Sequence, residues 1–405
     1  MKQRNFSTKK NAKNGAKNRR TKPKNKQVAR TLEFRVESMD SMGQGVAKID
    51  SKPCFIAKTL PGEQGKASLT KSSKGVMFAK LDTLDITADN REEPACPHFE
   101  SCPGCHYLHT DYVSELAYKQ QALQHHLNRL GVELPTIDIS PAMERLGYRN
   151  RIQLHYRHKY IGMMDGATNN VVEIPGCLAL APELKSVFDQ LYKDKSWVVE
   201  HDWQGHCELY FTNDGVSVEW DQPYAHGGFS QINNTMNEVL KASVANQVNR
   251  DEAKVETLLD LFSGEGNLSD ALVDNIAVGD GSLVQRVMVD YAPDRVAQEE
   301  LSFVHLDLFS ESALRTFKAR TEYKQFDVLL VDPPRKGFPD MALWINAYKP
   351  KKLIYVSCNA ATMVRDLQQL SELESSKKYS IDHIELIDLF PSTYHYETLV
   401  TVSFY

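Results

Sequence analysis

The sequence has 405 residues, of which 25% are charged and 41% are hydrophobic, and its mean hydropathy is −0.44. This balance is typical of a globular protein with two or three domains. No apolar run approaches the roughly 18 residues of a membrane-spanning helix, and the N-terminus lacks the apolar region of a secretory signal. We therefore expect a cytoplasmic monomer without membrane attachment. The net charge of −5 argues against a nucleic-acid partner only if the charge is spread evenly, and it is not.

Residues 1–30 are strongly basic. They contain 12 Lys and Arg residues and no Asp or Glu, which leaves 36 basic against 53 acidic residues in the rest of the chain. Because the segment has almost no aliphatic residues, it cannot bury enough surface to offset the entropy of ordering, and we expect a disordered tail. Such a tail can bind a polyanion such as RNA, or it can serve solubility alone.

Residues 31–89 contain five short strand-like segments separated by turn signals. They predict a small closed β-barrel of the oligonucleotide-binding kind. The strings Gly43–Ala47, Pro53–Ile56 and Leu60–Glu63 resemble the TRAM domain, an RNA-binding barrel of RNA-modifying enzymes. A barrel without an RNA role is the alternative. The expected strands are Leu32–Val36, Gly45–Ile49, Cys54–Ala57, Gly65–Leu69 and Val76–Leu81.

Residues 90–250 are predicted to form a central α+β domain. They begin with a cysteine cluster, after which apolar residues at helical spacing predict a helix over Tyr112–Leu130, with Gly131 as its stop. Strands and then a linking helix are expected in the rest of this region, at Arg151–Arg157, Val216–Trp220 and residues 231–250.

Residues 251–405 alternate between strands and helices, which predicts a doubly wound, Rossmann-like α/β domain. The expected strands are Thr257–Leu261, Val287–Asp290, Ser302–Leu306, Val328–Val331 and Lys352–Ser357, with helices starting at Asn267 and Pro293.

The first of these strands runs into a glycine turn. Gly264 and Gly266 let the backbone approach a ligand closely, but Ser269 stands where a dinucleotide fingerprint has its third glycine. The next strand ends at Asp290, whose carboxylate can accept hydrogen bonds from ribose hydroxyls. This combination resembles class I methyltransferases that use S-adenosylmethionine, and a nucleotide-binding dehydrogenase is the alternative.

Two reactive side chains follow in this domain. Cys358 comes at the end of a buried strand and Glu397 comes just before the last one. A thiolate that adds to C6 of a uracil makes C5 nucleophilic enough to attack a methyl group, and a base must then remove the C5 proton so that the thiolate can leave. The pair therefore predicts methylation at C5 of a pyrimidine, with Cys358 as the nucleophile and Glu397 as the base.

Three strings together resemble the RNA uracil-C5 methyltransferase family: Asp-Pro-Pro-Arg-Lys-Gly at 332–337, Ser-Cys-Asn-x-x-Thr at 357–362 and Phe-Pro-x-Thr-x-His-x-Glu at 390–397. The resemblance covers about residues 31–405 and implies the same roles for Cys358 and Glu397. Ala360 replaces a usual proline and Ser392 a usual histidine, which affects loop geometry rather than the reacting groups. Together with Gly264, the implied donor or target contacts are Gln231, Phe262, Asn267, Asp290, Asp307 and Asp332.

Seven cysteines in a chain without a signal suggest a reducing compartment and metal-binding or catalytic roles. Cys96, Cys102 and Cys105 have the spacing C-x5-C-x2-C, and Cys177 is the candidate fourth ligand. Four thiolates can hold zinc or an iron–sulfur cluster, and the spacing does not choose between them. The resemblance to the ribosomal-RNA branch of the family implies a [4Fe-4S] cluster with a structural role; zinc and unligated thiols are the alternatives.

The sequence thus predicts an S-adenosylmethionine-dependent enzyme that methylates C5 of a specific uridine in RNA through a covalent Cys–C6 adduct. Stacking hides C5 and C6 within a helix, so the base must be flipped out, and a structured RNA loop is the expected partner. The barrel and cysteine cluster together favour 23S rRNA. The alternatives are the same chemistry on tRNA, a non-catalytic RNA-binding ribosome assembly factor, and an iron–sulfur redox sensor.

Overall fold

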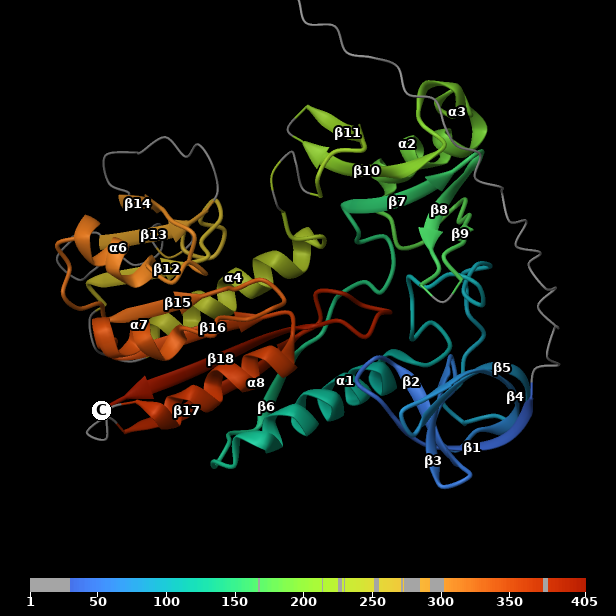
Figure 1. Ribbon diagram of the computed structural model, residues 1–405, viewed down its shortest axis with the longest axis horizontal. Helices are drawn as coiled ribbons and strands as arrows, with labels where there is room; N and C mark the ends of the chain where they lie inside the picture. The colour runs from blue at the N-terminus through green and yellow to red at the C-terminus, as the bar shows by residue number, and fades with distance from the viewer. Residues whose placement is uncertain are drawn as a thin grey trace, which may run out of the picture.

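A computed structural model describes residues 30–405 except 167, 213, 225–227, 229, 251–254, 271, 273–284, 292–301 and 374–377 (Figure 1). Residues 1–29 of the predicted tail and the helix predicted at Pro293 lie outside the described residues. None of the helices formed by the described residues has the length and apolar character that crossing a bilayer requires.

The N-terminal part of the described chain is a closed five-stranded barrel, as predicted. Leu32, Phe34 and Val36 alternate with exposed residues along the first strand, so one face of the strand fills the barrel and the other meets solvent. The barrel has the strand order β1-β2-β3-β5-β4, with β1 (Thr31–Met39), β2 (Gln44–Ile49), β3 (Lys52–Ala57), β4 (Gln64–Ser73) and β5 (Val76–Ile86).

A segment with little regular structure, residues 87–111, connects the barrel to helix α1 (Tyr112–Leu127), which continues as the 3₁₀ turn η1 (Asn128–Leu130). Asp111 caps α1, because its carboxylate accepts the Ser114 N–H at 2.7 Å. Gly131 ends the helical stretch at a φ of 68°, a left-handed conformation that glycine adopts without strain.

The central region forms a five-stranded sheet in the order β11-β10-β7-β8-β9. Two helices pack against it around Trp197, Leu184 and Phe188, which are buried in the same apolar cluster as the strand residues. The elements are β7 (Arg151–Arg157), β8 (Tyr160–Met164), β9 (Val171–Val172), α2 (Pro182–Lys193), α3 (Trp197–Glu200), β10 (Gln204–Thr212) and β11 (Gly215–Trp220).

The C-terminal part is built on an eight-stranded sheet in the order β14-β13-β12-β15-β16-β18-β17-β6. Neighbouring strands from β14 to β16 are parallel, β18 is antiparallel to both β16 and β17, and β6 pairs in parallel with β17. The strands are β6 (Ile137–Ser140), β12 (Thr257–Leu261), β13 (Gln285–Asp290), β14 (Ser302–His305), β15 (Val328–Val331), β16 (Lys352–Ser357), β17 (Tyr379–Ile387) and β18 (Glu397–Phe404).

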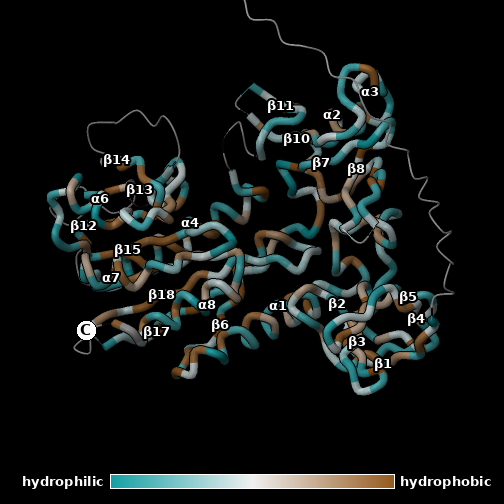
Figure 2. Tube along the Cα trace, in the orientation of Figure 1, coloured by the Kyte–Doolittle hydropathy of each residue, from teal (hydrophilic) through white to brown (hydrophobic). Residues whose placement is uncertain are grey.

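Helices cover both faces of this sheet, which confirms the doubly wound prediction. Alternate residues of β15 divide between two buried clusters, with Leu329 among residues of α1, α6, α7 and α8 and Leu330 among residues of α4. Apolar residues accordingly run along the central strands (Figure 2). The covering helices, besides α1, are α4 (Asn234–Asn249), α6 (Ala313–Arg320), α7 (Met341–Tyr348) and α8 (Ala360–Gln368), the last followed by η2 (Gln369–Glu372).

One predicted helix start is wrong by three residues. Turns occupy Gly264–Ser269, and helical conformation begins at Asp270 rather than at Asn267. The N–H groups of Ser269 and Asp270 both donate to the Gly266 carbonyl, at 3.0 and 2.8 Å, so a tight turn over residues 266–269 precedes the regular helix.

Candidate active site and cysteine pocket

The two candidate reacting groups lie at the sheet edge where the parallel strands end. β16 ends one residue before Cys358, and the antiparallel strand β18 begins at Glu397. Ser357 pairs with Thr398 at the end of the β16–β18 ladder, which places Cys358 and Glu397 at the adjoining positions just beyond it. The charge of Glu397 accordingly acts on the Cys358 thiol. Opposite residues of antiparallel strands have Cα atoms about 4.5–5.5 Å apart and side chains on the same face. The sheet therefore brings the thiol and the carboxyl together.

The glycine turn after β12 approaches the end of β13. The Gly264 N–H donates to Asp290 Oδ2 at 2.8 Å, so these two predicted donor contacts are joined directly. Phe262 has a φ of 62°, and its ring lies 5.0 Å from the Phe338 ring and 5.3 Å from the Phe309 ring. A positive φ is uncommon for a bulky residue and persists only where the surroundings enforce it. This strained, aromatic-lined turn is typical of a ligand site.

The other predicted donor contacts are held by different means. Asn267 exchanges two hydrogen bonds of 2.9 Å with Asn237, which fastens the glycine turn to α4. Gln231 is buried three residues before α4, and its carbonyl accepts a hydrogen bond from Asn150 at 2.8 Å. Asp307 follows β14, and its carboxylate accepts the N–H two residues further on at 2.9 Å. Asn267 and Gln231 are thus linked through α4, whereas Asp307 lies two residues before Phe309, whose ring contacts Phe262.

Burial first and neighbouring acids second determine the electrostatics around the thiol. Burial raises the pKa of the Cys358 thiol to about 12; the charges of Glu397 and Asp332 add to the rise, and Arg335 opposes it. Burial also raises the pKa of Glu397 well above its ordinary value, again with Asp332 adding and Arg335 opposing. Glu397 Oε2 is buried and has no hydrogen-bond partner among the described residues. The site therefore favours an additional positive charge.

One acidic residue of the site, Asp260, is not among those predicted from the sequence. It is 3% exposed within β12, and its carboxylate accepts the Ser269 hydroxyl at 2.5 Å. Burial raises the pKa of Asp260 to about 7, and burial together with the charges of Asp260 and Asp290 raises the pKa of Asp332 to about 7. An acid inside an otherwise apolar strand, Leu258–Leu261, is the sequence signal that could have found it.

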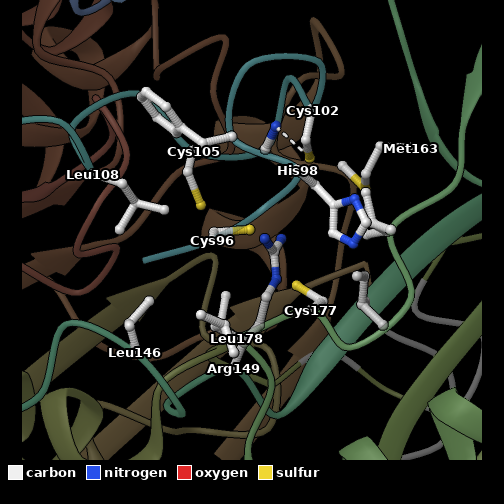
Figure 3. A pocket seen from close by; sticks show the side chains of 15 residues that line it. Cys96, His98, Cys102, Cys105, Leu108, Leu146, Arg149, Met163, Cys177 and Leu178 are labelled. Atoms are coloured by element: carbon white, nitrogen blue, oxygen red, sulfur yellow. Dashed lines mark hydrogen bonds between the residues drawn. The ribbon is translucent and has the colours of Figure 1, made fainter. Parts of the chain in front are cut away.

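The four candidate ligand cysteines line one pocket between segment 87–111 and the central sheet (Figure 3). Burial raises the pKa of Cys105 to about 12, and the charges of Cys102, Cys177 and Cys96 add to the rise, so the four sulfurs lie near enough to interact. No group of three or more His, Cys, Asp or Glu side chains within the described parts of the chain is arranged to hold a metal ion. The structure thus shows a shared thiol pocket and does not show the predicted cluster.

The neighbours of this pocket favour sulfur over nitrogen ligands. His98 lines the pocket, but its Nε2 is hydrogen-bonded to the Pro175 carbonyl at 2.7 Å. The Gly104 N–H donates to Cys102 Sγ at 3.3 Å, and the Arg149 guanidinium lowers the pKa of Cys105 against the larger effect of burial. Hydrogen bonds and positive charge stabilise thiolates.

The fold and the edge site together define a class I S-adenosylmethionine-dependent methyltransferase: a doubly wound sheet whose last strand inserts antiparallel beside β16, with a glycine turn joined to Asp290. Two family models match the chain, one described as tRNA (Uracil-5-)-methyltransferase over residues 218–403 and one described as TRAM domain over residues 25–81. Over residues 218–403 the chain therefore resembles the RNA uracil-C5 methyltransferase family.

Curated relatives extend the similarity over nearly the whole chain. A protein of Shewanella sp. (strain W3-18-1) named 23S rRNA (uracil(1939)-C(5))-methyltransferase RlmD is 28% identical over 92% of this chain and 96% of its own. A protein of the same name from Pectobacterium carotovorum is 27% identical over 94% and 96%. The crystal structure of a Pyrococcus abyssi tRNA (uracil-54, C5)-methyltransferase with S-adenosyl-L-homocysteine has a TM-score of 0.66 at 18% identity, covering 92% of this chain and 100% of that chain. That structural match confirms the fold.

Proposed function

We propose that this protein transfers a methyl group from S-adenosylmethionine to C5 of a uridine in 23S rRNA. The observation that carries the proposal is the strand register that makes Cys358 and Glu397 neighbours at the edge of the sheet where Asp332 and the glycine turn also lie. The curated relatives named as 23S rRNA enzymes, similar over more than nine-tenths of this chain, support the substrate. A ribosomal RNA substrate implies a cytoplasmic enzyme.

The residues around the glycine turn fit the methyl donor. S-adenosylmethionine supplies a methyl group on a positively charged sulfur. The buried acids Asp260 and Glu397 and the half-buried Asp332 all have raised pKa values, and a positive charge nearby would favour their ionised forms. We assign donor binding to residues at this turn and around it, with Asp290 accepting ribose hydroxyls. These residues are Gln231, Phe262, Gly264, Asn267, Asp290, Asp307 and Asp332.

Cys358 and Glu397 divide the chemistry. The Cys358 thiolate adds to C6, its electron pair forms the S–C6 bond, and the π electrons of C5=C6 shift toward the C4 carbonyl to give an enolate. The enolate carbon C5 then bonds to the methyl carbon while the bond from that carbon to the donor sulfur breaks, and the sulfur keeps the electron pair and leaves as neutral S-adenosylhomocysteine. Glu397 then takes the proton from C5; the electrons of the C5–H bond restore C5=C6, and the S–C6 bond breaks to return the thiolate. A buried carboxylate with a raised pKa is a stronger base than an exposed one.

The barrel and the site around Cys358 and Glu397 are compatible with a structured RNA from which one base is flipped out. The TRAM barrel and the basic tail would hold flanking RNA, while the flipped uracil enters the site between Cys358 and the donor. The second candidate is the same chemistry on tRNA, which the description of the family model favours.

We also propose that Cys96, Cys102, Cys105 and Cys177 hold a [4Fe-4S] cluster. The shared pocket, the N–H donated to Cys102 sulfur and the nearby Arg149 support thiolate ligation. The cluster would have a structural role, because its ligands come from segment 87–111 and from the loop after β9, two parts of the chain that are 72 residues apart at Cys105 and Cys177.

The test combines RNA mapping with two active-site variants. Loss of 5-methyluridine at one position of 23S rRNA in a strain lacking the gene, and its return with the wild-type gene, is the expected result; loss in tRNA alone selects the second candidate. Cys358→Ala should form no covalent adduct with RNA carrying 5-fluorouridine, whereas Glu397→Gln should form the methylated adduct and release it slowly. Adduct formation by Cys358→Ala would show that the mechanism is wrong.

A further inference from the structure

The loop that leads into Glu397 is held by residues from a distant part of the chain. This loop, residues 388–396, connects β17 to β18 and reaches toward the start of α1 (Figure 1). Ser392, at its centre, is 1% exposed and has a φ of 65°. Its N–H donates to Glu115 Oε1 at 2.7 Å, its hydroxyl donates to the Arg145 carbonyl at 3.2 Å, and its carbonyl accepts the N–H groups of His106 and Tyr107 at 2.8 and 3.1 Å.

A group of four charged residues, three of them buried and Arg145 partly exposed, contacts the same loop. Lys119 Nζ donates to Glu115 Oε1 and to Asp388 Oδ1, both at 2.7 Å, and to the Phe390 carbonyl at 3.3 Å. Arg145 donates to Glu115 Oε2 at 2.7 Å. Lys119 is 1% exposed and the two acids are fully buried. Two cations and two carboxylates thus balance each other, and the loop is bonded at both Asp388 and Ser392.

Such an arrangement is better suited to fixing geometry than to adding stability. Removing two charges from water costs about as much as their attraction returns, so apolar residues would stabilise the fold as well or better. Charged hydrogen bonds instead have preferred lengths and directions, which define one position for the atoms that they join. A left-handed Ser392 persists because every polar group of its backbone is bonded in that position.

We propose that Glu115, Lys119 and Asp388 are positioning residues that fix the orientation of the Glu397 carboxylate through loop 388–396. The inference rests on the proposed function, since it assigns the group to the proton-removal step. Glu397 begins β18 directly after the loop, and its own Oε2 has no hydrogen-bond partner among the described residues that could orient it locally. The pairing of Glu397 with Ile387 holds its backbone on the β17 side, and the loop fixes the chain that enters it from the other side, so both set the direction of the base.

The segment that contains Cys105 also contacts loop 388–396. His106 and Tyr107, whose N–H groups bond to the Ser392 carbonyl, follow directly after Cys105. The His106 ring also packs edge-on against the Tyr394 ring, with centroids 4.6 Å apart. Whatever orders the segment that contains Cys105 thus also orders the loop before Glu397.

Two isosteric variants, Glu115→Gln and Asp388→Asn, test the proposal, because each removes one charge and keeps the side-chain shape. Asp327→Asn is the matched control. Asp327 accepts Lys351 Nζ at 2.8 Å and two backbone N–H groups, but it lies at the start of β15, the opposite edge of the sheet from Glu397. Rapid-quench single turnovers on uridine RNA with methyl-labelled donor separate adduct formation from product release.

Both test variants should form the labelled protein–RNA adduct within about threefold of the wild-type rate and release it at least tenfold more slowly. In the Asp327→Asn control, neither the rate of adduct formation nor the rate of release should change in this way. Release at the wild-type rate, or equal slowing of formation and release, would overturn the proposal, because a general loss of structure affects both steps. Wild-type protein that forms no adduct at all would instead refute the proposed function, which keeps the two failures distinct.

Discussion

The charge on the donor should control the reactivity of Cys358. Burial and the charges of Glu397 and Asp332 raise the pKa of this thiol to about 12, so a protein without donor holds almost no thiolate at neutral pH. Bound S-adenosylmethionine brings a positive sulfur, which favours the thiolate over the neutral thiol and therefore lowers the pKa. An opposite charge within about 4–6 Å lowers such a pKa by about 1–3 units. With a fall of ~2 units, the thiolate fraction at pH 8 rises from ~10⁻⁴ to ~10⁻².

Alkylation of Cys358 by iodoacetamide, followed by peptide mass spectrometry, measures this effect. S-adenosylhomocysteine is the matched ligand control, because it fills the same site with an uncharged sulfur. Alkylation at pH 8 should be about 100-fold faster with S-adenosylmethionine than with S-adenosylhomocysteine, and the two rates should converge as the pH approaches 12. Arg335→Gln should slow alkylation in both complexes, because it removes the cation that opposes the rise. Equal rates with both ligands at pH 8 would refute the reasoning.

Two further predictions concern other parts of the site. Cys177→Ser should remove iron and the broad absorbance near ~400 nm from anaerobically purified protein. The control Cys207→Ser, at a buried cysteine of the central sheet, should retain both the iron and the absorbance. Stoichiometric zinc in colourless wild-type protein would contradict the cluster. The raised pKa of Asp332, about 7 against 3.8, means that the folded ligand-free protein binds a proton more tightly than the unfolded chain, so stability is lost as the pH rises from 4 to 7. Asp332→Asn should therefore raise the melting temperature at pH 8 but hardly at pH 4, while lowering methylation; a lower melting temperature at pH 8 would contradict this.

Local sequence patterns predicted most of the strands because those patterns are what the fold buries. Leu32, Phe34 and Val36 alternate as a barrel strand must, and the apolar run at Val328–Val331 is a strand covered by helices on both faces. The strand Ile137–Ser140 was not predicted, because its partner β17 lies more than 240 residues further along the chain. Four residues carry too little periodicity to reveal a pairing that only the finished sheet defines.

The site residues were predictable where chemistry restricts the residue type. A thiol and a carboxyl in matching strings predict Cys358 and Glu397 as the reacting groups, and the register places the two residues close together. The Asn267 side chain was predicted as a donor contact, yet it is bonded to Asn237 of a helix that begins 33 residues earlier. The Glu115 carboxylate and Ser392 N–H also meet only through the tertiary fold. Contacts between residues so far apart in sequence leave no local signal.

The position of β18 between β16 and β17 has a consequence for biosynthesis. Both neighbours precede β18 in the chain, so the sheet keeps an open gap until residues 397–404 have left the ribosome. A nascent chain that ends before Glu397 can already contain a folded barrel and the cysteine at the end of β16, but it lacks the carboxyl group that we propose as the base. While the gap is open, the end of β16 that precedes Cys358 also lacks the hydrogen bonds of the β16–β18 ladder. Insertion of one late strand thus closes the sheet and brings Glu397 to the end of β16 in a single step.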